Sequence, residues 1–134
     1  MKLKSTVIFV CLLLSACGAF SGAGPAQTVK DYHLRADSGN ADAMTKLFSS
    51  RAIKEKGEPK IREQNQSFVE MVEKIKDEDI KPEVFEIKES VNGDKATVNF
   101  RYGVPGARSG SIASKCELVK ENGEWKIEQF VDPF

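Results

Sequence analysis

The stretch ELVKENGEWKI, residues 117–127, predicts a tight β-hairpin and with it the class of the fold. On both sides of Asn122-Gly123, apolar and polar side chains alternate, as they do in strands with one buried face. Asn-Gly is preferred in type I′ turns because both turn positions take positive φ. A two-residue turn here pairs Leu118 with Ile127, so the two strands present their apolar side chains to the same face.

A second dipeptide of this kind, Asn92-Gly93, lies between two further alternating runs and predicts a second hairpin. The expected strands cover residues 84–91, 95–102, 111–121 and 124–131. The cross-strand pairs expected from the two turns are Ile87–Val98, Phe85–Phe100, Leu118–Ile127, Cys116–Gln129 and Lys120–Trp125, with Glu117 and Glu128 as neighbours on the outer face. Together the hairpins predict a four-stranded antiparallel meander.

Upstream of the strands the apolar period is helical. The expected helices cover residues 25–37, 41 to about 50, and 61–76. Residues 51–60 are charged and broken by a glycine and a proline, which predicts a loop. Gln64 and Asn65 lie on the apolar side of the third helix, which indicates that this helix begins after Ile61. Three N-terminal helices packed on a curved, mainly antiparallel four-stranded sheet make an α+β fold.

The order of elements resembles the nuclear transport factor 2-like (cystatin-like) superfamily, in particular its small bacterial lipoproteins with a domain of unknown function. The resemblance is carried by VKDY at residues 29–32, DSGN at 37–40 and the hairpin at 117–127, and it extends from about residue 25 to residue 134. It implies a cone, in which a strongly curved sheet wraps around a long helix. Some members of the superfamily isomerise, cyclise or dehydrate apolar substrates, while others bind ligands or assemble with other proteins.

The first residues predict export. Two lysines within residues 1–4 are followed by an apolar run at 6–14 and by small residues, the arrangement of a signal peptide. The run is about half of the ~20 residues that a membrane-spanning helix needs. LSAC at residues 14–17 resembles the lipobox of bacterial lipoproteins at every position, which implies cleavage before Cys17 and acylation of that cysteine.

The resemblance to the lipobox divides the chain into three parts. They are a signal peptide at 1–16, the lipidated Cys17 with a flexible tether at 17–24, and a domain at 25–134. Fatty acyl chains such as palmitate would hold the domain at a membrane of the bacterial cell envelope. Gly18, which stands where inner-membrane lipoproteins carry aspartate, implies the periplasmic face of the outer membrane if the organism is Gram-negative.

Charge and cysteine content exclude several classes of function. The 134 residues carry 20 cationic and 20 anionic side chains, and loss of Lys2 and Lys4 with the leader leaves 18 and 20, a formal charge of −2. An acidic chain without a basic run offers no footprint for nucleic acid. With Cys11 removed and Cys17 acylated, Cys116 has no disulfide partner and is expected to be a buried apolar side chain. One histidine and one free cysteine provide no metal set, and no cofactor is expected.

Five residues are the expected polar lining of a ligand pocket inside the cone. They are Tyr32, His33, Tyr102, Ser114 and Gln129. An apolar wall with a few placed polar groups is typical of small-molecule sites. His33 has a second interpretation as a general base, oriented by Asp37 four residues later. No motif fixes a catalytic set, so no catalytic residue is assigned.

The sequence therefore favours an exported, lipid-anchored accessory protein that binds a small apolar or amphipathic ligand or a protein partner in the envelope. Two alternatives stay open. One is an enzyme of the same fold that acts on an apolar substrate by general acid–base proton transfer, which the lack of a nucleophile motif disfavours. The other is a structural adaptor that works through a homodimer formed across the sheet.

Overall fold

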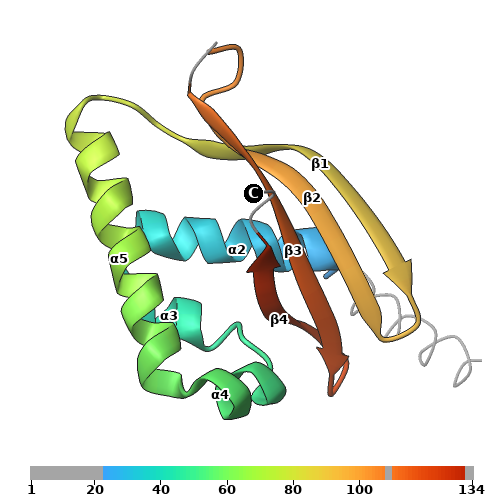
Figure 1. Cartoon of the computed structure of the whole chain (residues 1–134). Helices are drawn as coiled ribbons and strands as arrows, with labels where there is room; N and C mark the ends of the chain where they lie inside the picture. The colour runs from blue at the N-terminus through green and yellow to red at the C-terminus, as the bar shows by residue number, and fades with distance from the viewer. Residues whose placement is uncertain (1–22, 108–109, 132–134) are drawn as a thin grey trace, which may run out of the picture.

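The computed structural model describes residues 23–107 and 110–131. Within these residues four helices precede four strands (Figure 1). The elements are α2 (Pro25–Asp37), α3 (Ala41–Thr45), α4 (Ser50–Lys56), α5 (Glu58–Asp77), β1 (Glu83–Asn92), β2 (Lys95–Gly103), β3 (Ser111–Glu121) and β4 (Glu124–Val131). The predicted signal peptide, Cys17 and most of the tether lie outside the described residues.

The four strands form one antiparallel sheet in the order β1-β2-β3-β4, so the predicted meander is confirmed. The sheet is strongly bent, and α2 lies across its concave side (Figure 1). Contacts join α2 to β1, β2 and β4, whereas α5 packs on the other helices. The α+β class, with helices packed on a curved antiparallel sheet, is therefore confirmed.

The core lies between α2 and the concave face of the sheet. Val29 and Ala36, one stripe of the helix, are 0% and 1% exposed, and the sheet contributes Val98 and Ile127, which are both fully buried. The spacing of the two α2 residues is seven, so they lie two turns apart on the same face. The helix ends before Gly39, whose φ of 72° is the left-handed conformation that closes a helix.

The second predicted helix is wrong in its extent, because α3 ends well before residue 50. Phe48 instead makes a parallel β-bridge with Ile127 at the edge of the sheet. The Ile127 amide donates to the Leu47 carbonyl at 2.8 Å, and the Ser49 amide donates to the Ile127 carbonyl at 2.9 Å. These backbone bonds to β4 hold the segment extended, so a tertiary contact overrides the local helical pattern.

The loop predicted at residues 51–60 is also wrong, since this segment holds most of α4 and the start of α5. The Ser49 hydroxyl accepts from the Ala52 amide at 3.0 Å and N-caps α4. Gly57, with a φ of 86°, separates the two helices, and Pro59 lies in the first turn of α5, where it removes no helical hydrogen bond. The glycine and the proline thus mark a helix junction, and within residues 23–107 the three predicted helices become four.

Near the turn of the β3–β4 hairpin the predicted register is confirmed. Asn122-Gly123 has φ values of 51° and 79°, as a type I′ turn requires. Leu118 pairs with Ile127, and both side chains are buried. Lys120 pairs with Trp125, and its amino group lies 5.7 Å from the centroid of the indole.

Farther from this turn the register shifts at an irregularity after Glu117. Cys116 pairs with Phe130 rather than with Gln129, and Glu117 pairs with Gln129 rather than with Glu128. Both predicted pairs are therefore wrong, because a bulge places an extra residue in one strand and regular alternation cannot reveal it.

In the β1–β2 hairpin the predicted register is wrong from the turn onward. The two turn residues are Gly93-Asp94 rather than Asn92-Gly93. Only the glycine among these residues has positive φ, so it takes the first central position of the turn. Val98 consequently pairs with Glu89 and not with the predicted Ile87.

A second irregularity lies in β1 between Phe85 and Lys88, where Glu86 has a φ of 50°. Phe85 pairs with Arg101, so the predicted pair with Phe100 is wrong. Bulges bend the strand that carries them and increase its twist. The irregularity therefore contributes to the curvature that opens the concave side of the sheet.

Candidate ligand-binding pocket

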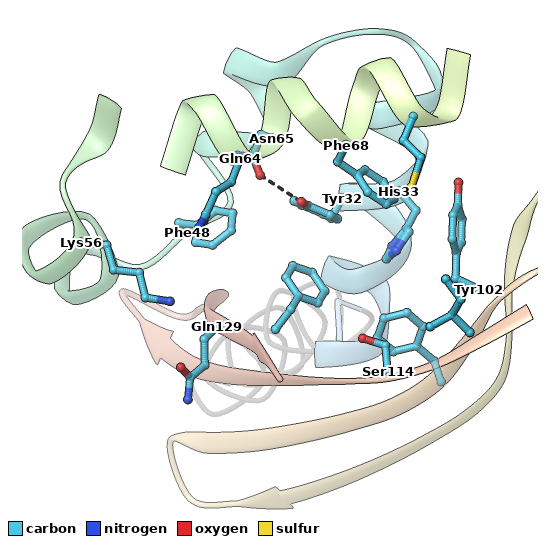
Figure 2. Close-up of a pocket in the computed structure, with 14 residues that line it drawn as sticks. Tyr32, His33, Phe48, Lys56, Gln64, Asn65, Phe68, Tyr102, Ser114 and Gln129 are labelled. Carbon is cyan, nitrogen blue, oxygen red and sulfur yellow. Dashed lines mark hydrogen bonds between the residues drawn. The ribbon is translucent and has the colours of Figure 1, made fainter. Parts of the chain in front are cut away.

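A cavity of about 400 Å³ lies between the concave side of the sheet and the helices α2 and α5 (Figure 2). This volume is within the range of about 300–1,000 Å³ that small-molecule sites occupy. Half of its fourteen lining residues carry aromatic rings. These are Tyr32, His33, Phe48, Phe68, Phe100, Tyr102 and Phe130.

All five residues predicted from the sequence line this cavity: Tyr32, His33, Tyr102, Ser114 and Gln129. The first two come from α2, and the others come from β2, β3 and β4. Figure 2 shows Gln129 at one end, with its amide turned away from Tyr32 and His33. Its Nε2 donates to Glu117 Oε2 at 2.9 Å, so this amide group is held outside the cavity.

The ring of His33 is the centre of the aromatic wall. Its centroid lies 4.6 Å from that of Tyr102, 5.3 Å from that of Phe100 and 5.6 Å from that of Phe68. The two phenylalanine rings meet the imidazole nearly edge to face, at 76° and 87°, which is a favourable arrangement for aromatic pairs. Rings from α2, α5 and β2 thus join into one continuous surface.

A chain of buried hydrogen bonds fixes the tyrosine on α2. The Tyr32 hydroxyl donates to Asn65 Oδ1 at 2.9 Å, and Asn65 Nδ2 donates to Thr45 Oγ1 at 3.0 Å. The threonine hydroxyl in turn donates to the Ala41 carbonyl at 2.9 Å. The chain ties α2, α3 and α5 together and holds the Tyr32 ring at the cavity wall.

Sequence reasoning missed the role of Asn65. The helix α5 begins at Glu58, so the interpretation that it begins after Ile61 is wrong and Asn65 lies well inside the helix. Asn65 is 1% exposed, and buried polar side chains are almost always hydrogen-bonded. The polar residue on an apolar stripe was therefore a signal for a buried partner.

His33 is neutral at physiological pH. Its Nδ1 lies 2.8 Å from the Val29 carbonyl, and because a carbonyl only accepts, Nδ1 carries the proton. Burial lowers the pKa of His33 from 6.5 to about 4, and the hydrogen bond to Val29 opposes this shift only in part. In this tautomer Nε2 is a hydrogen-bond acceptor.

Two tyrosines and one cysteine near the wall are neutral as well. Burial raises the pKa of Tyr102 to about 12, and it also raises the pKa of Tyr32. Cys116 is fully buried, as predicted, and burial raises the pKa of its thiol. A protonated thiol is a poor nucleophile, so this cysteine acts as an apolar core residue.

Lys56 is the one lining residue of the cavity with a formal charge, and the lining contains no aspartate or glutamate. In the described ranges, no group of three or more His, Cys, Asp and Glu side chains is placed to hold a metal ion. None of the helices that the structure describes is long and apolar enough to cross a membrane. The lining thus combines seven aromatic rings with a single cation.

No family model and no curated protein matches the chain. Among solved structures, a protein of Campylobacter jejuni, named on a provisional basis as a nuclear transport factor 2-like transpeptidase, matches with a TM-score of 0.57 and 15% identity, over 78% of this chain and 97% of that one. A SEC-C motif protein of Rhodopseudomonas palustris matches with a TM-score of 0.57 and 15% identity, over 88% and 89% of the two chains.

These likenesses establish the fold. The helices packed on an open four-stranded antiparallel sheet are the nuclear transport factor 2-like arrangement, as the order of elements in the sequence predicts. Chains at this level of identity share an architecture and host unrelated functions. The function must therefore be argued from the cavity itself.

Proposed function

We propose that the domain binds a small apolar or amphipathic molecule in the cavity between α2, α5 and the sheet. The observation that carries this proposal is the cavity of about 400 Å³, of whose fourteen lining residues seven carry aromatic rings. Ile112 and Met71 belong to the same lining and are 59% and 39% exposed, so apolar surface continues from the cavity toward solvent. Contiguous apolar surface of this kind commonly marks a binding site.

The low pKa of His33 favours a ligand-binding function over an enzyme that works by proton transfer. A general base works best when its pKa is near the operating pH, and the pKa of His33 is about 4. Its Nδ1 is already held by the Val29 carbonyl, and Asp37, the residue expected to orient the ring, makes no hydrogen bond to it within the described residues. The enzyme alternative therefore has less support than a binding site.

The adaptor alternative is also less favoured. An adaptor that works only through its outer surface has no need of a hollow interior, because a filled core is more stable than one with a cavity. The cavity is instead retained beside a buried hydrogen-bond chain that holds Tyr32 in place. A binding site needs such fixed walls, since ordering them in advance lowers the entropic cost of binding.

The position of the domain in the cell is proposed from the sequence. Acylation at Cys17, after removal of residues 1–16, would tether the domain to a membrane of the cell envelope through the short linker at 17–24. The ligand or protein partner would then be one that is present at the envelope. The outer membrane is the proposed location in a Gram-negative organism.

Titration of the full chain with two neutral probes, 2-naphthamide and decanamide, tests the binding proposal. We expect at least one probe to raise the melting temperature, because a ligand that binds only the folded state stabilises it. Ser114→Phe should weaken binding, since Ser114 lines the cavity. Ala113→Phe is the matched control, because the adjacent residue of β3 points to the opposite face. Absence of binding for both probes, or equal loss in both variants, would contradict the proposal.

A further inference from the structure

The formal charge in the cavity lining is a single cation at one end. Lys56 carries this charge, and the remaining thirteen lining residues are apolar, aromatic or neutral polar. Figure 2 shows the amino group of Lys56 directed toward the interior, on the side of the cavity opposite Tyr102. Gln64 of α5 lines the same end and is exposed to solvent. A cation and an amide donor are thus placed at one end of an aromatic chamber.

The position of Lys56 follows from the helix junction. Lys56 lies in the last turn of α4, and Gly57, with a φ of 86°, turns the chain directly into α5. The neighbouring Phe48 bridge ties the start of α4 to the sheet. The base of the lysine side chain is therefore held by two fixed elements, while its amino group stays free to reach a ligand.

Two of the three carboxylates near Lys56 accept hydrogen bonds from other side chains. A groove on the other side of Lys56 is lined by Glu55, Glu117 and Glu128. Glu55 accepts from Arg51 at 3.0 Å, and Glu117 accepts from Gln129 at 2.9 Å. Among the described residues no ion pair within 4.0 Å includes Lys56, although its neighbour in sequence, Glu55, is paired.

We propose that the cavity selects an amphipathic anion, with its apolar body among the aromatic rings and a single carboxylate-like group at Lys56. This inference rests on the proposed function, because it assigns the chemistry of the ligand for the same cavity. Charge-assisted hydrogen bonds are stronger than neutral ones, and the lysine can donate to the anion while Gln64 donates a second bond. A dianion is disfavoured, since the lining supplies one cation, and a cation is disfavoured by charge repulsion.

A pair of probes of the same shape tests this proposal. The affinities of 2-naphthoate and the neutral 2-naphthamide for the full chain are measured by calorimetry at low and at high salt. We expect naphthoate to bind about threefold to tenfold tighter at low salt, which corresponds to a partly exposed charge contact. Salt should reduce this preference, because screening weakens exposed charge pairs.

Substitution of the lysine identifies the contact. Lys56→Met should remove the preference for naphthoate, so that the two probes then bind the variant with equal affinity. Lys54→Met is the matched control, because Lys54 is an exposed lysine in the same last turn of α4 and does not line the cavity. Equal effects of the two variants, or equal affinity for both probes, would overturn the proposal while leaving the binding function intact. If neither naphthalene probe nor decanamide binds, the proposed function itself fails.

Discussion

His33 has a consequence for the pH dependence of stability. Its pKa in the folded protein is about 4, below the value of 6.5 for an unburied histidine. Between these values the unfolded chain binds more protons than the folded one, so stability is present above about pH 6.5 and is lost as the pH falls toward 4. The group is neutral in the fold, and protonating it requires charging a buried ring.

Urea unfolding at about pH 7 and about pH 4.5 measures this effect. We expect His33 to contribute a loss of about 2 to 3 kcal/mol over this interval. His33→Gln should remove that share, while the titration of carboxylates remains in both proteins. If the free energy of unfolding fell by the same amount between the two pH values in the wild-type protein and in the variant, the buried environment assigned to the imidazole would be contradicted.

Asn65 supports the cavity wall through its hydrogen bond to Tyr32. Asn65→Leu leaves the buried hydroxyl of Tyr32 without its acceptor, which costs about 1–3 kcal/mol for an unpaired buried group. Tyr32→Phe combined with Asn65→Leu should recover part of that loss, because both partners are then apolar. Denaturation of the two single variants and the double variant gives the coupling energy. A double variant no more stable than Asn65→Leu alone would speak against the bond.

At the residue scale, the sequence predicts which residues line the cavity better than it predicts what those residues do. Tyr32 and His33 follow from the helical period, and Tyr102 and Ser114 follow from the period of two in the strands. Those periods decide which face a residue takes, and the face decides whether it meets the cavity. Lys56 escaped prediction because no pattern marks a charged residue that approaches a cavity from a helix end.

At the scale of elements, local turn chemistry explains why the register was predicted correctly beside one hairpin turn and not beside the other. Asn122-Gly123 takes positive φ at both positions, and the register beside it agrees with the prediction. The turn at Gly93-Asp94 lies one residue later than predicted, and the partners of the residues beside it in the other hairpin therefore shift by two residues. The bulges in β1 and β4 each add a residue to one strand, which the alternation of that strand does not reveal.

The junction between α3 and α4 is the element most dependent on tertiary contact. Ser49→Ala removes the side chain that accepts from the Ala52 amide, and we expect a loss of about 1 kcal/mol, as for other N-cap serines. Ser38→Ala is a suitable control, because its exposed hydroxyl donates to the Leu34 carbonyl and caps no helix amide. Thermal or urea unfolding gives both values. Equal effects would mean that Ser49 does not cap α4.

At the scale of the whole molecule, the anchor is a prediction of the sequence alone. Cys17→Ala should abolish incorporation of a labelled palmitate analogue and release the protein from membranes, because no acyl chain is then attached. Cys116→Ala is the control, since this buried thiol is far from any acylation motif and should leave labelling unchanged. Membrane retention of unlabelled wild-type protein would contradict the anchor.

The central claim is that the concave side of the sheet holds the ligand. The most direct measurement is the set of NMR contacts between protons of bound 2-naphthoate and protein side chains. We predict contacts to Phe68 and Tyr102, which line the cavity from α5 and β2. An outer groove lined by Arg101 and Lys115 also offers cations to an anion. Contacts confined to those two residues, with none to the aromatic wall, would contradict the account.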